Sequence, residues 1–248
     1  MARQRLDGEL VRRGLAPSRE RAADLIRDGR VTVGGAVAVK PARLVLRGDA
    51  IEIVGPPPAF VGRGGVKLDA ALTHFGIDVE GRRALDAGAS TGGFTDCLLQ
   101  RGVTEVVAVD VGHGQLHEHL RADPRVIVRE RTNVRMLDAD AIGGAVPAIV
   151  ADLSFISLRT VAAALLACAA PEADLVLLVK PQFEAGRSEA SRGRGVIRDP
   201  AVRVRALEEV SRTYSERGAS IMGMMQSPIT GADGNVEYLL HLRNGGAR

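Results

Sequence analysis

The stretch Ala84-Leu-Asp86-Ala-Gly88-Ala-Ser-Thr-Gly92-Gly93-Phe passes from an apolar run through a glycine-rich turn into a helical pattern. Strand, turn and helix in this order are typical of nucleotide-binding sheets, because glycine lets a ligand approach the backbone closely. The turn lacks both the Gly-x-Gly-x-x-Gly spacing of dinucleotide sites and the lysine of a phosphate-binding loop. It therefore favours S-adenosylmethionine, whose methionine carboxylate and adenosine need no pyrophosphate cradle, over a dinucleotide.

The next apolar run ends in Val109-Asp110, at the distance from the turn where nucleotide-binding sheets place an acidic residue. A carboxylate there can accept hydrogen bonds from both ribose hydroxyls of the ligand. Alone, the glycine turn would serve equally well as a structural tight turn. Asn133 is a candidate for the adenine, although asparagine after a strand is usually a turn former. The expected cofactor-binding residues are Asp86, Gly88, Ser90, Thr91, Gly92, Gly93, Asp110, Val111, Asn133 and Asp152.

Apolar runs alternate with helical stretches through the rest of the chain. Continuous apolar strands separated by helices indicate a parallel sheet with helices on both faces, so the predicted fold class is α/β with a Rossmann-like sheet. The segment Arg187 to Asp199 is rich in glycine and arginine and is predicted to be a mobile loop. The predicted strands are Ala84 to Ala87, Val106 to Asp110, Val126 to Arg129, Ala148 to Asp152, Leu175 to Lys180 and Tyr238 to Leu242.

The N-terminal quarter is predicted to be a separate small α+β domain. Leu6 and Leu10 share one helical face, and Ser18 is a candidate N-cap of a second helix. Gly34-Gly35 between two short apolar runs predicts a tight hairpin. The segment 55–58, Gly-Pro-Pro-Pro, suits neither a helix nor a central strand. We therefore predict domains over 1–54 and 63–248, joined by a stiff proline-rich linker over 55–62.

The net charge of +3 conceals a basic excess near the N-terminus. Residues 1–62 hold 11 Lys and Arg against 7 Asp and Glu, whereas the remainder holds 22 against 23. Such a patch suits a polyanion, although a solvated basic face is the simpler alternative. Aromatic residues are only 3%, so RNA recognition would rely on phosphates and shape rather than on base stacking. The candidate RNA-binding residues are Arg5, Arg12, Arg13, Arg19, Arg21, Arg27, Arg30 and Arg63.

Two charged residues, Asp152 and Lys180, lie at the carboxyl ends of otherwise apolar predicted strands. Ligands of open α/β sheets collect at that edge, so both side chains are expected to face the cofactor site. Burial there is costly unless the two charges pair, and a purely structural ion pair is the alternative. Lys67 and Glu237 come from opposite ends of the domain, and by themselves they read as surface charges.

These motifs resemble a known family along nearly the whole chain. Arg5-Leu-Asp, Ser18-Arg, Leu25-Ile and Val31 onward are similar to the S4 RNA-binding domain. The second domain resembles FtsJ-type ribose 2′-O-methyltransferases, and the two together look like the TlyA family of ribosomal RNA methyltransferases, also called hemolysin A. The second resemblance rests on Arg63-Gly-Gly-Val-Lys-Leu, Asp86-Ala-Gly-Ala-Ser-Thr-Gly-Gly-Phe-Thr-Asp, Val109-Asp-Val-Gly, Glu130-Arg-Thr-Asn, Ala151-Asp-Leu-Ser-Phe-Ile-Ser, Lys180-Pro-Gln-Phe-Glu-Ala-Gly-Arg, Arg198-Asp-Pro, and Ser227-Pro-Ile through Gly234-Asn-Val-Glu.

The resemblance implies a Lys-Asp-Lys-Glu catalytic tetrad, which falls on Lys67, Asp152, Lys180 and Glu237. It implies S-adenosylmethionine as cofactor and methyl transfer to a ribose 2′-hydroxyl, on cytidine, of ribosomal RNA within ribosomal subunits. Such a transfer is an in-line displacement, so its main needs are alignment and removal of the hydroxyl proton. We hypothesise that Lys180 orients the hydroxyl and, when neutral, takes its proton. Base methylation is the nearest rival reaction.

Several classes of protein are disfavoured. Cys97 and Cys168 stand in apolar surroundings without partners at metal-ligand spacing, so we expect buried thiols, no metal and no redox chemistry. The N-terminus is charged where a signal peptide is apolar, and the weakly polar run Val161 to Ala170 is too short to span a membrane. We therefore expect a cytoplasmic protein, most simply a monomer, without stable membrane association. A membrane-active hemolysin and a non-catalytic RNA-binding ribosome assembly factor are the alternatives.

Overall fold

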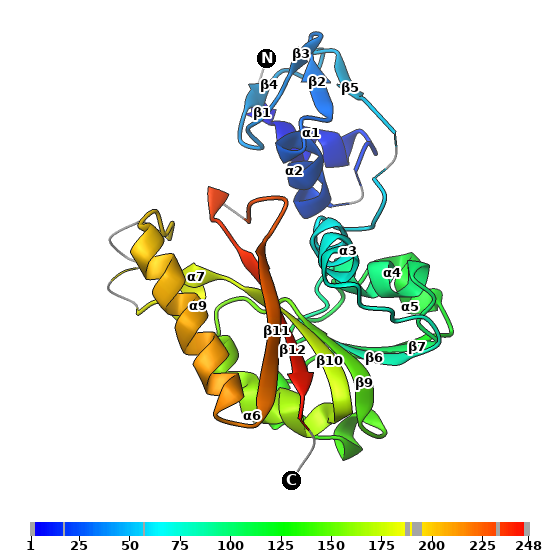
Figure 1. Ribbon diagram of the computed structural model, residues 1–248. Coiled ribbons are helices and arrows are strands. Elements are labelled where there is room, and N and C mark those ends of the chain that lie inside the picture. Colours follow the sequence, from blue (N-terminus) through cyan, green and yellow to red (C-terminus); the bar gives the residue numbers. More distant parts are fainter. Residues whose placement is uncertain are drawn as a thin grey trace. The chain divides into compact units, whose positions relative to one another are not determined.

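The chain forms two compact units, Met1–Gly62 and Arg63–Arg248 (Figure 1). The computed structural model describes residues 3–16, 18–56, 58–186, 189, 195–231 and 234–245. The proline-rich segment 55–62 belongs to the first unit. Of the loop predicted over 187–199, only Glu189 and residues 195–199 lie within the described residues.

The first unit combines two helices with two small sheets. Ser18 caps the second helix by accepting a hydrogen bond from the backbone N–H of Arg21 at 3.2 Å, as predicted. Gly34 and Gly35 have φ of +61° and +79°, the left-handed values that a tight hairpin turn requires. The elements are β1 (Gln4–Arg5), α1 (Leu6–Arg12), α2 (Arg19–Arg27), β2 (Val31–Val33), β3 (Ala36–Val37), β4 (Leu44–Val45) and β5 (Ile51–Ile53).

The pairing of these strands adds a detail to the prediction. Strands β2 and β3 form the predicted hairpin, and β5 pairs with β2 to complete an antiparallel sheet in the order β3-β2-β5. Strands β1 and β4 form a separate two-stranded sheet that was not predicted. These strands are two residues long, too short for an alternating pattern to show. The apolar faces of the helices and strands meet in one core, made of Leu6, Leu10, Ala16, Ala22, Leu25, Ile26, Val31, Val33, Ala38, Val45 and Ile51.

The second unit is built on a seven-stranded sheet in the order β11-β12-β10-β9-β6-β7-β8. Strands β10, β9, β6, β7 and β8 are parallel to one another, as the alternation of apolar runs and helices predicted. Their buried positions are almost wholly apolar, since both faces of the sheet are covered. The strands are β6 (Arg83–Ala87), β7 (Glu105–Val109), β8 (Val126–Arg129), β9 (Val146–Ala151), β10 (Ala169–Val179), β11 (Ala219–Gln226) and β12 (Tyr238–Asn244).

The edge formed by β11 and β12 departs from the prediction. Strand β12 was expected to be parallel, but it runs antiparallel to both β10 and β11. Strand β11 was not predicted at all. Its pairing shifts register between Ile221 and Gly223, which breaks the two-residue alternation by which a half-buried strand is recognised.

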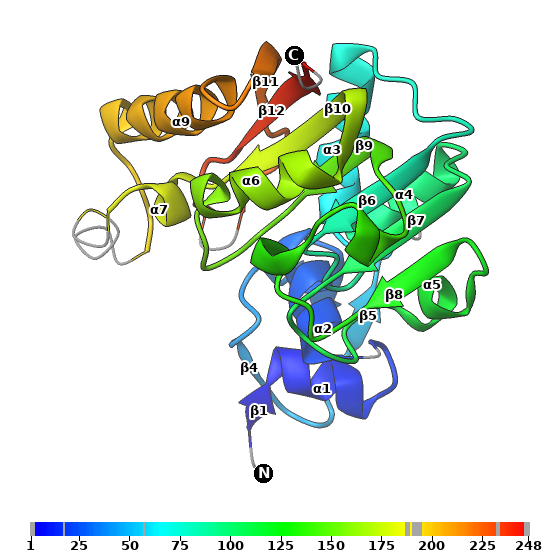
Figure 2. The ribbon, with the colours of Figure 1, turned by 90° about the horizontal axis from the view of Figure 1, so that it is seen from below.

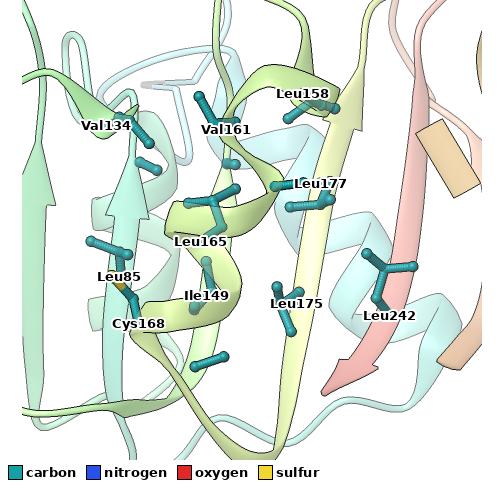
Figure 3. Close-up of a cluster of buried hydrophobic side chains, with 14 of the residues drawn as sticks. Leu85, Val134, Ile149, Leu158, Val161, Leu165, Cys168, Leu175, Leu177 and Leu242 are labelled. Carbon is teal, nitrogen blue, oxygen red and sulfur yellow. The ribbon is translucent and has the colours of Figure 1, made fainter. Parts of the chain in front are cut away.

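Helices cover the two faces of this sheet (Figures 1 and 2). Helices α3 and α4 pack together on one face, and α6 and α9 pack together on the other. Figure 3 shows Val161, Leu165 and Cys168 of α6 among strand residues such as Leu85 and Ile149. The helical elements are α3 (Gly64–Phe75), α4 (Gly93–Gln100), α5 (Glu118–Ala122), η1 (Val134–Met136), η2 (Asp140–Ile142), α6 (Leu158–Cys168), α7 (Pro181–Glu184) and α9 (Pro200–Ser215).

Both cysteines behave as predicted in this core. Cys97 and Cys168 have no exposed surface. Burial raises the pKa of the Cys97 thiol to about 12 and that of the Cys168 thiol to about 11. Neutral thiols at these positions act as small apolar side chains.

Candidate active site

The carboxyl ends of the central parallel strands are tied together by backbone hydrogen bonds. The N–H of Gly88, just after β6, donates to the carbonyl of Val109 at the end of β7 at 2.8 Å. On the other side of β6, the N–H of Asp152 donates to the carbonyl of Ala87 at 3.0 Å. The loops that follow three neighbouring strands therefore start from one fixed edge, the place where ligands bind in open α/β sheets.

The turn after β6 has two positions whose backbone conformation favours glycine. Gly88 has φ of +90°, and a Cβ there would lie 2.5 Å from the carbonyl oxygen of Asp152. Gly92 has φ of +97°, and a Cβ there would overlap the side chains of Leu116 and Leu120. The turn leads directly into α4 at Gly93, so backbone N–H groups of the first helical turn are free of intrahelical partners. This close-packed turn fits the approach of a nucleoside cofactor to the backbone.

Asp110, just after β7, is held between two turns. Its carboxylate accepts the N–H of Ser90 at 2.8 Å and the N–H of Gly112 at 2.6 Å. Each carboxylate oxygen keeps a further lone pair, which is what contact with ribose hydroxyls would need. The neighbouring Val111 is 75% exposed, although it is a large apolar residue. Asn133 acts as an N-cap, its side chain accepting the N–H of Arg135 at 3.1 Å, as expected of a turn former.

Asp86 forms the buried floor beneath this turn. Its Oδ2 accepts a hydrogen bond from Thr95 Oγ1 at 2.6 Å, and Oδ1 has no hydrogen-bond partner among the described residues. Burial raises the pKa of Asp86 to about 7, the nearby carboxylate of Asp152 adds to the rise, and the Thr95 hydrogen bond opposes it. A buried carboxylate with an unpartnered oxygen suits a site whose ligand is a cation.

Asp152 and Lys180 form the ion pair that their places in the sequence predicted. The Nζ of Lys180 lies 2.5 Å from Asp152 Oδ1, and its hydrogen bond goes to Ser154 Oγ at 2.9 Å. The Lys180 side chain is 11% exposed, so the ammonium is largely withdrawn from water. Phe183 lies beneath it, with the ring centroid 5.9 Å from Nζ.

Lys67 and Glu237 form a second buried pair. Lys67 Nζ lies 2.5 Å from Glu237 Oε2, and their side chains are 9% and 3% exposed. The chain wraps closely around this carboxylate, because a Cβ at Gly231 would overlap Glu237 Oε1. Neither residue is an ordinary surface charge, which was the simpler reading of the sequence.

The sheet register brings the two pairs to the same edge. Val179 of β10 is paired with Tyr238 of β12, so Lys180 and Glu237 are the next residues beyond the last pair. On the other side, a Cβ at Gly64 in the first turn of α3 would lie 3.7 Å from Asp152 Oδ2. All four residues of the predicted tetrad thus lie where β9, β10, β12 and α3 meet.

The composition of the chain also distinguishes this site. Of the 33 basic residues only three are lysine, namely Lys40, Lys67 and Lys180, and the other 30 are arginine. Arginine cannot lose its proton in proteins, whereas a buried lysine can. Two of the three lysines, Lys67 and Lys180, stand in the buried pairs at this edge.

Three further residues near Lys180 were not predicted from the sequence. Ser154 accepts its hydrogen bond, and Glu184 is a buried carboxylate four residues further along the chain. Phe155 is 92% exposed and has φ of +65°, a strained value for a side chain of this size. An exposed large aromatic beside a polar site is a typical feature of a binding surface.

The predicted RNA-binding arginines have different surroundings. In the first unit, Arg12 and Arg13 both pair with the buried Glu9, and Arg5 and Arg19 both pair with Asp7. Arg27 pairs with Asp24, and Arg30 donates to the carbonyls of Val54 and Gly55. No side-chain hydrogen bond or ion pair is found for Arg21 within the described part of the unit. Arg63 belongs to the second unit, where it donates to the carbonyl of Thr230.

The described residues contain neither a metal site nor a membrane-spanning helix. They contain no group of three or more His, Cys, Asp or Glu side chains arranged to hold a metal ion. No helix in the described ranges has both the length and the apolar character needed to cross a membrane.

The fold and the residues at the carboxyl edge of the sheet define the class of protein. A mostly parallel sheet with a glycine turn after its first strand and a carboxylate after the second is the arrangement of Rossmann-like methyltransferases. An S-adenosylmethionine-dependent methyltransferase from Mesorhizobium loti shares the fold, with a TM-score of 0.50 at 15% identity over 70% of this chain and 96% of that one.

The family follows from residues 60–244, which match the FtsJ-like methyltransferase model, while residues 4–51 match the S4 domain. The chain belongs to the FtsJ-like methyltransferase family. It is 55% identical to the 16S/23S rRNA (cytidine-2′-O)-methyltransferase TlyA of Mycobacterium tuberculosis, over 97% of this chain and 90% of that one. A hemolysin-named structure from Streptococcus thermophilus is similar over 100% of this chain and 90% of that one, with a TM-score of 0.79 and 38% identity. The resemblance, the predicted methyltransferase fold and the predicted class of enzyme are confirmed.

Proposed function

We propose that this protein transfers a methyl group from S-adenosylmethionine to the ribose 2′-hydroxyl of a cytidine in ribosomal RNA, acting on ribosomal subunits in the cytoplasm. The relative from M. tuberculosis is named for this reaction. The observation that carries the proposal is the pair of buried lysine–carboxylate contacts at the carboxyl edge of the sheet. A ribose hydroxyl is a weak acid, so an enzyme that methylates it must handle a proton close to the reacting oxygen.

The residues after β6 and β7 are suited to hold the cofactor. When bound, S-adenosylmethionine supplies a sulfonium methyl group that a nucleophilic oxygen can attack. The turn from Gly88 to Gly93 would face the methionine part, and the Asp110 carboxylate would accept the ribose hydroxyls. Val111 and Asn133 follow neighbouring strands and would lie toward the adenine. Asp86 and Asp152 would favour a cationic ligand through their charge.

Lys180 is the residue we assign to the 2′-hydroxyl. Its Nζ lies between Asp152 and Ser154, which hold the amine in one direction. Only the neutral amine can accept the hydroxyl proton. The pair of Lys67 and Glu237 borders this position and would fix the geometry of the ribose.

The S4 domain and the arginines of the first unit would supply phosphate contacts. Several of these arginines are oriented by buried carboxylates, so their guanidinium groups are positioned before RNA arrives. The exposed ring of Phe155 is one aromatic surface beside Lys180 on which a nucleotide base could stack. Flipping the target nucleotide out of its helix would bring its ribose to the amine.

The test is a matched set of lysine substitutions. Lys180→Met keeps the aliphatic stem and removes the amine, and we expect methyl transfer to ribosomal subunits to fall by roughly 10²- to 10⁴-fold with cofactor affinity retained. Lys40→Met makes the same change at the one lysine outside the site and should transfer at the wild-type rate. Transfer is measured with labelled S-adenosylmethionine, and cofactor affinity by calorimetry.

Nucleoside analysis of the digested RNA identifies the product. We expect 2′-O-methylcytidine. A base-methylated nucleoside would contradict ribose chemistry, and the absence of any methylated product from either subunit would favour a non-catalytic assembly factor.

A further inference from the structure

At the carboxyl edge of the sheet, two segments contact each other at both of their ends. The loop between β9 and α6 runs over residues 152–157, and the segment after β10 runs from Lys180 to Glu184. At one end, Lys180 contacts Asp152 and Ser154. At the other end, Glu184 contacts the residues where the loop becomes α6. Lys180 and Glu184, the first and last residues of one segment, therefore both hold the other loop.

The second end depends on the Glu184 carboxylate. Its Oε2 accepts a hydrogen bond from Ser157 Oγ at 2.5 Å, and its Oε1 accepts the backbone N–H of Leu158 at 2.8 Å. Ser157 is the N-cap of α6, so Glu184 binds the first turn of that helix, where the helix dipole favours a negative charge. Arg159 completes the contact by donating to the Glu184 carbonyl at 2.8 Å.

Between the two ends lies a strained residue. Phe155 has φ of +65° and its ring packs against that of Phe183 at a centroid distance of 5.2 Å. A bulky residue in this region of backbone conformation persists only where the surrounding contacts enforce it. The contacts of Ser154 with Lys180 and of Ser157 with Glu184 flank Phe155 on both sides along the chain.

Burying the Glu184 carboxylate to hold the β9–α6 loop is energetically unfavourable. Glu184 is 4% exposed, and burial raises its pKa even though Ser157, Leu158 and Arg159 all favour the charged form. A buried ionised group is weak evidence for stability, since apolar packing would often do as well. It is better explained by a requirement for directed hydrogen bonds to two atoms of the neighbouring loop.

From this geometry we propose that Glu184 is a positioning residue for methyl transfer. It fixes the β9–α6 loop against the segment that carries Lys180, and so keeps the Lys180 amine on Asp152 and Ser154 and directed at the ribose hydroxyl. The inference rests on the proposed function, because it takes Lys180 as the residue that handles the proton. It adds a buried group that acts through Lys180 without touching substrate.

The test compares Glu184→Ala with Glu184→Gln and with a control, Glu209→Gln. Alanine removes both hydrogen bonds to the loop. Glutamine can still accept from Leu158 and can donate to Ser157, so it should restore most of the activity. Glu209 is the other carboxylate that Arg159 contacts, at 2.5 Å, and it makes no contact with the loop in the described structure. Its substitution perturbs Arg159 while leaving the contacts of the Glu184 carboxylate with Ser157 and Leu158 in place.

We expect Glu184→Ala to lower kcat by about 10²-fold, the cost of a misplacement on the scale of 1 Å, with the affinity for S-adenosylmethionine unchanged. Glu209→Gln should keep the wild-type kcat. If Glu184→Ala does not fold, Ser157→Ala removes one of the two contacts and should give a smaller loss of kcat. A folded Glu184→Ala or Ser157→Ala variant with wild-type kcat would overturn the proposal, as would a Glu184→Gln variant as inactive as the alanine variant.

Hydrogen exchange of residues 153–158 separates this inference from the proposed function. Loss of the Glu184 contacts should speed amide exchange in this loop, and Glu209→Gln should not. If the wild-type protein transfers no methyl group, the proposed function fails while the exchange result still decides whether Glu184 holds the loop. Equal exchange in the wild-type protein and the alanine variant would overturn the positioning role.

Discussion

Two buried aspartates of the second unit have pKa values shifted in opposite directions. Asp86 lies at the end of β6 with one hydrogen bond, from Thr95, and burial raises its pKa to about 7. Burial also acts on Asp174 of β10, but hydrogen bonds from His241, Arg82 and Arg243 outweigh it and hold the pKa at about 2. At Asp174 the three donors outweigh burial, whereas at Asp86 burial outweighs the single hydrogen bond from Thr95.

Asp86→Asn should stabilise the protein at neutral and alkaline pH. The raised pKa means that folded Asp86 binds a proton that the unfolded chain releases, so its contribution to stability falls as pH rises from about 4 to about 7. We expect the asparagine variant to have the higher Tm at about pH 8, with the difference shrinking as pH falls toward about 4. Thermal unfolding across this range checks it, and a lower Tm of the variant at about pH 8 would contradict it.

The same substitution should weaken cofactor binding, because the ionised Asp86 favours a cationic ligand. We expect the asparagine variant to bind S-adenosylmethionine more weakly than the wild-type protein does. Calorimetric titration at neutral pH measures the effect, and an unchanged affinity would remove Asp86 from the cofactor site.

Asp174→Asn should have the opposite effect on stability. Because the folded pKa is depressed, Asp174 stabilises the protein above the pKa of the unfolded chain, and this contribution is lost as pH falls from about 4 to about 2. We expect a loss of about 2 kcal/mol in the free energy of unfolding at neutral pH. Urea unfolding between neutral pH and about pH 3 measures it. A loss that did not narrow below about pH 4 would rule out this electrostatic origin.

At the scale of elements, the turn between β6 and α4 connects the cofactor side of the site with the tetrad. Gly88 lies against the backbone of Asp152, so the position of one turn sets the position of the loop that begins the other half of the site. Gly76, which ends α3, also has positive φ, but a Cβ there would meet no atom within 4 Å. Substitutions at Gly76 and Gly88 therefore distinguish the effect of backbone strain alone from the effect of strain combined with a steric clash.

Gly88→Ala should impair the site far more than Gly76→Ala. At Gly76 alanine incurs the strain of a left-handed conformation, roughly 1–2 kcal/mol. At Gly88 the methyl group also pushes the Asp152 loop away from β6, so we expect loss of both cofactor binding and methyl transfer. Calorimetry and the transfer assay at a temperature where both variants are folded provide the comparison. Equal activity of the two variants would show that the close approach at Gly88 is not needed.

At the scale of the whole molecule, the basic charge of the first unit is divided between structural and accessible arginines. Arg13 pairs with Glu9 and donates to the carbonyls of Asp49 and Arg47, at 2.9 and 2.8 Å, with a side chain 20% exposed. Arg19 pairs with Asp7 at 3.3 Å and is 63% exposed. The net charge counts the two equally, although their surroundings suit different tasks.

Arg19→Ala and Arg13→Ala should therefore differ in their effects on RNA binding and on stability. We expect Arg19→Ala to weaken binding to ribosomal RNA and to reduce the slope of log affinity against log salt by about 1, with little change in Tm. Arg13→Ala should lower the stability of the unit by roughly 1–3 kcal/mol, because it releases two backbone carbonyls and one contact of Glu9. Filter binding at several salt concentrations and thermal unfolding distinguish them. The reverse pattern would show that Arg13, and not Arg19, faces the RNA.

The amino-acid sequence by itself determined where the parallel strands lie along the chain, the hairpin and helix cap of the first unit, and the places of Asp110, Asp152 and Lys180. These features depend on local patterns, such as apolar runs, turn residues and charges at the ends of strands. Lys67 and Glu237 were assigned only through family resemblance, because no local pattern relates residues 170 positions apart.

The tertiary structure decided what depends on contacts between distant segments. The antiparallel direction of β12 and the presence of β11 follow from pairing at the sheet edge, and the register of β10 with β12 sets Lys180 beside Glu237. The contact of Glu184 with Ser157 likewise joins two loops that the sequence separates. Hydrogen bonds and ion pairs act over a few ångströms in space, so a pattern along the chain can place a charge at a strand end but cannot select its partner.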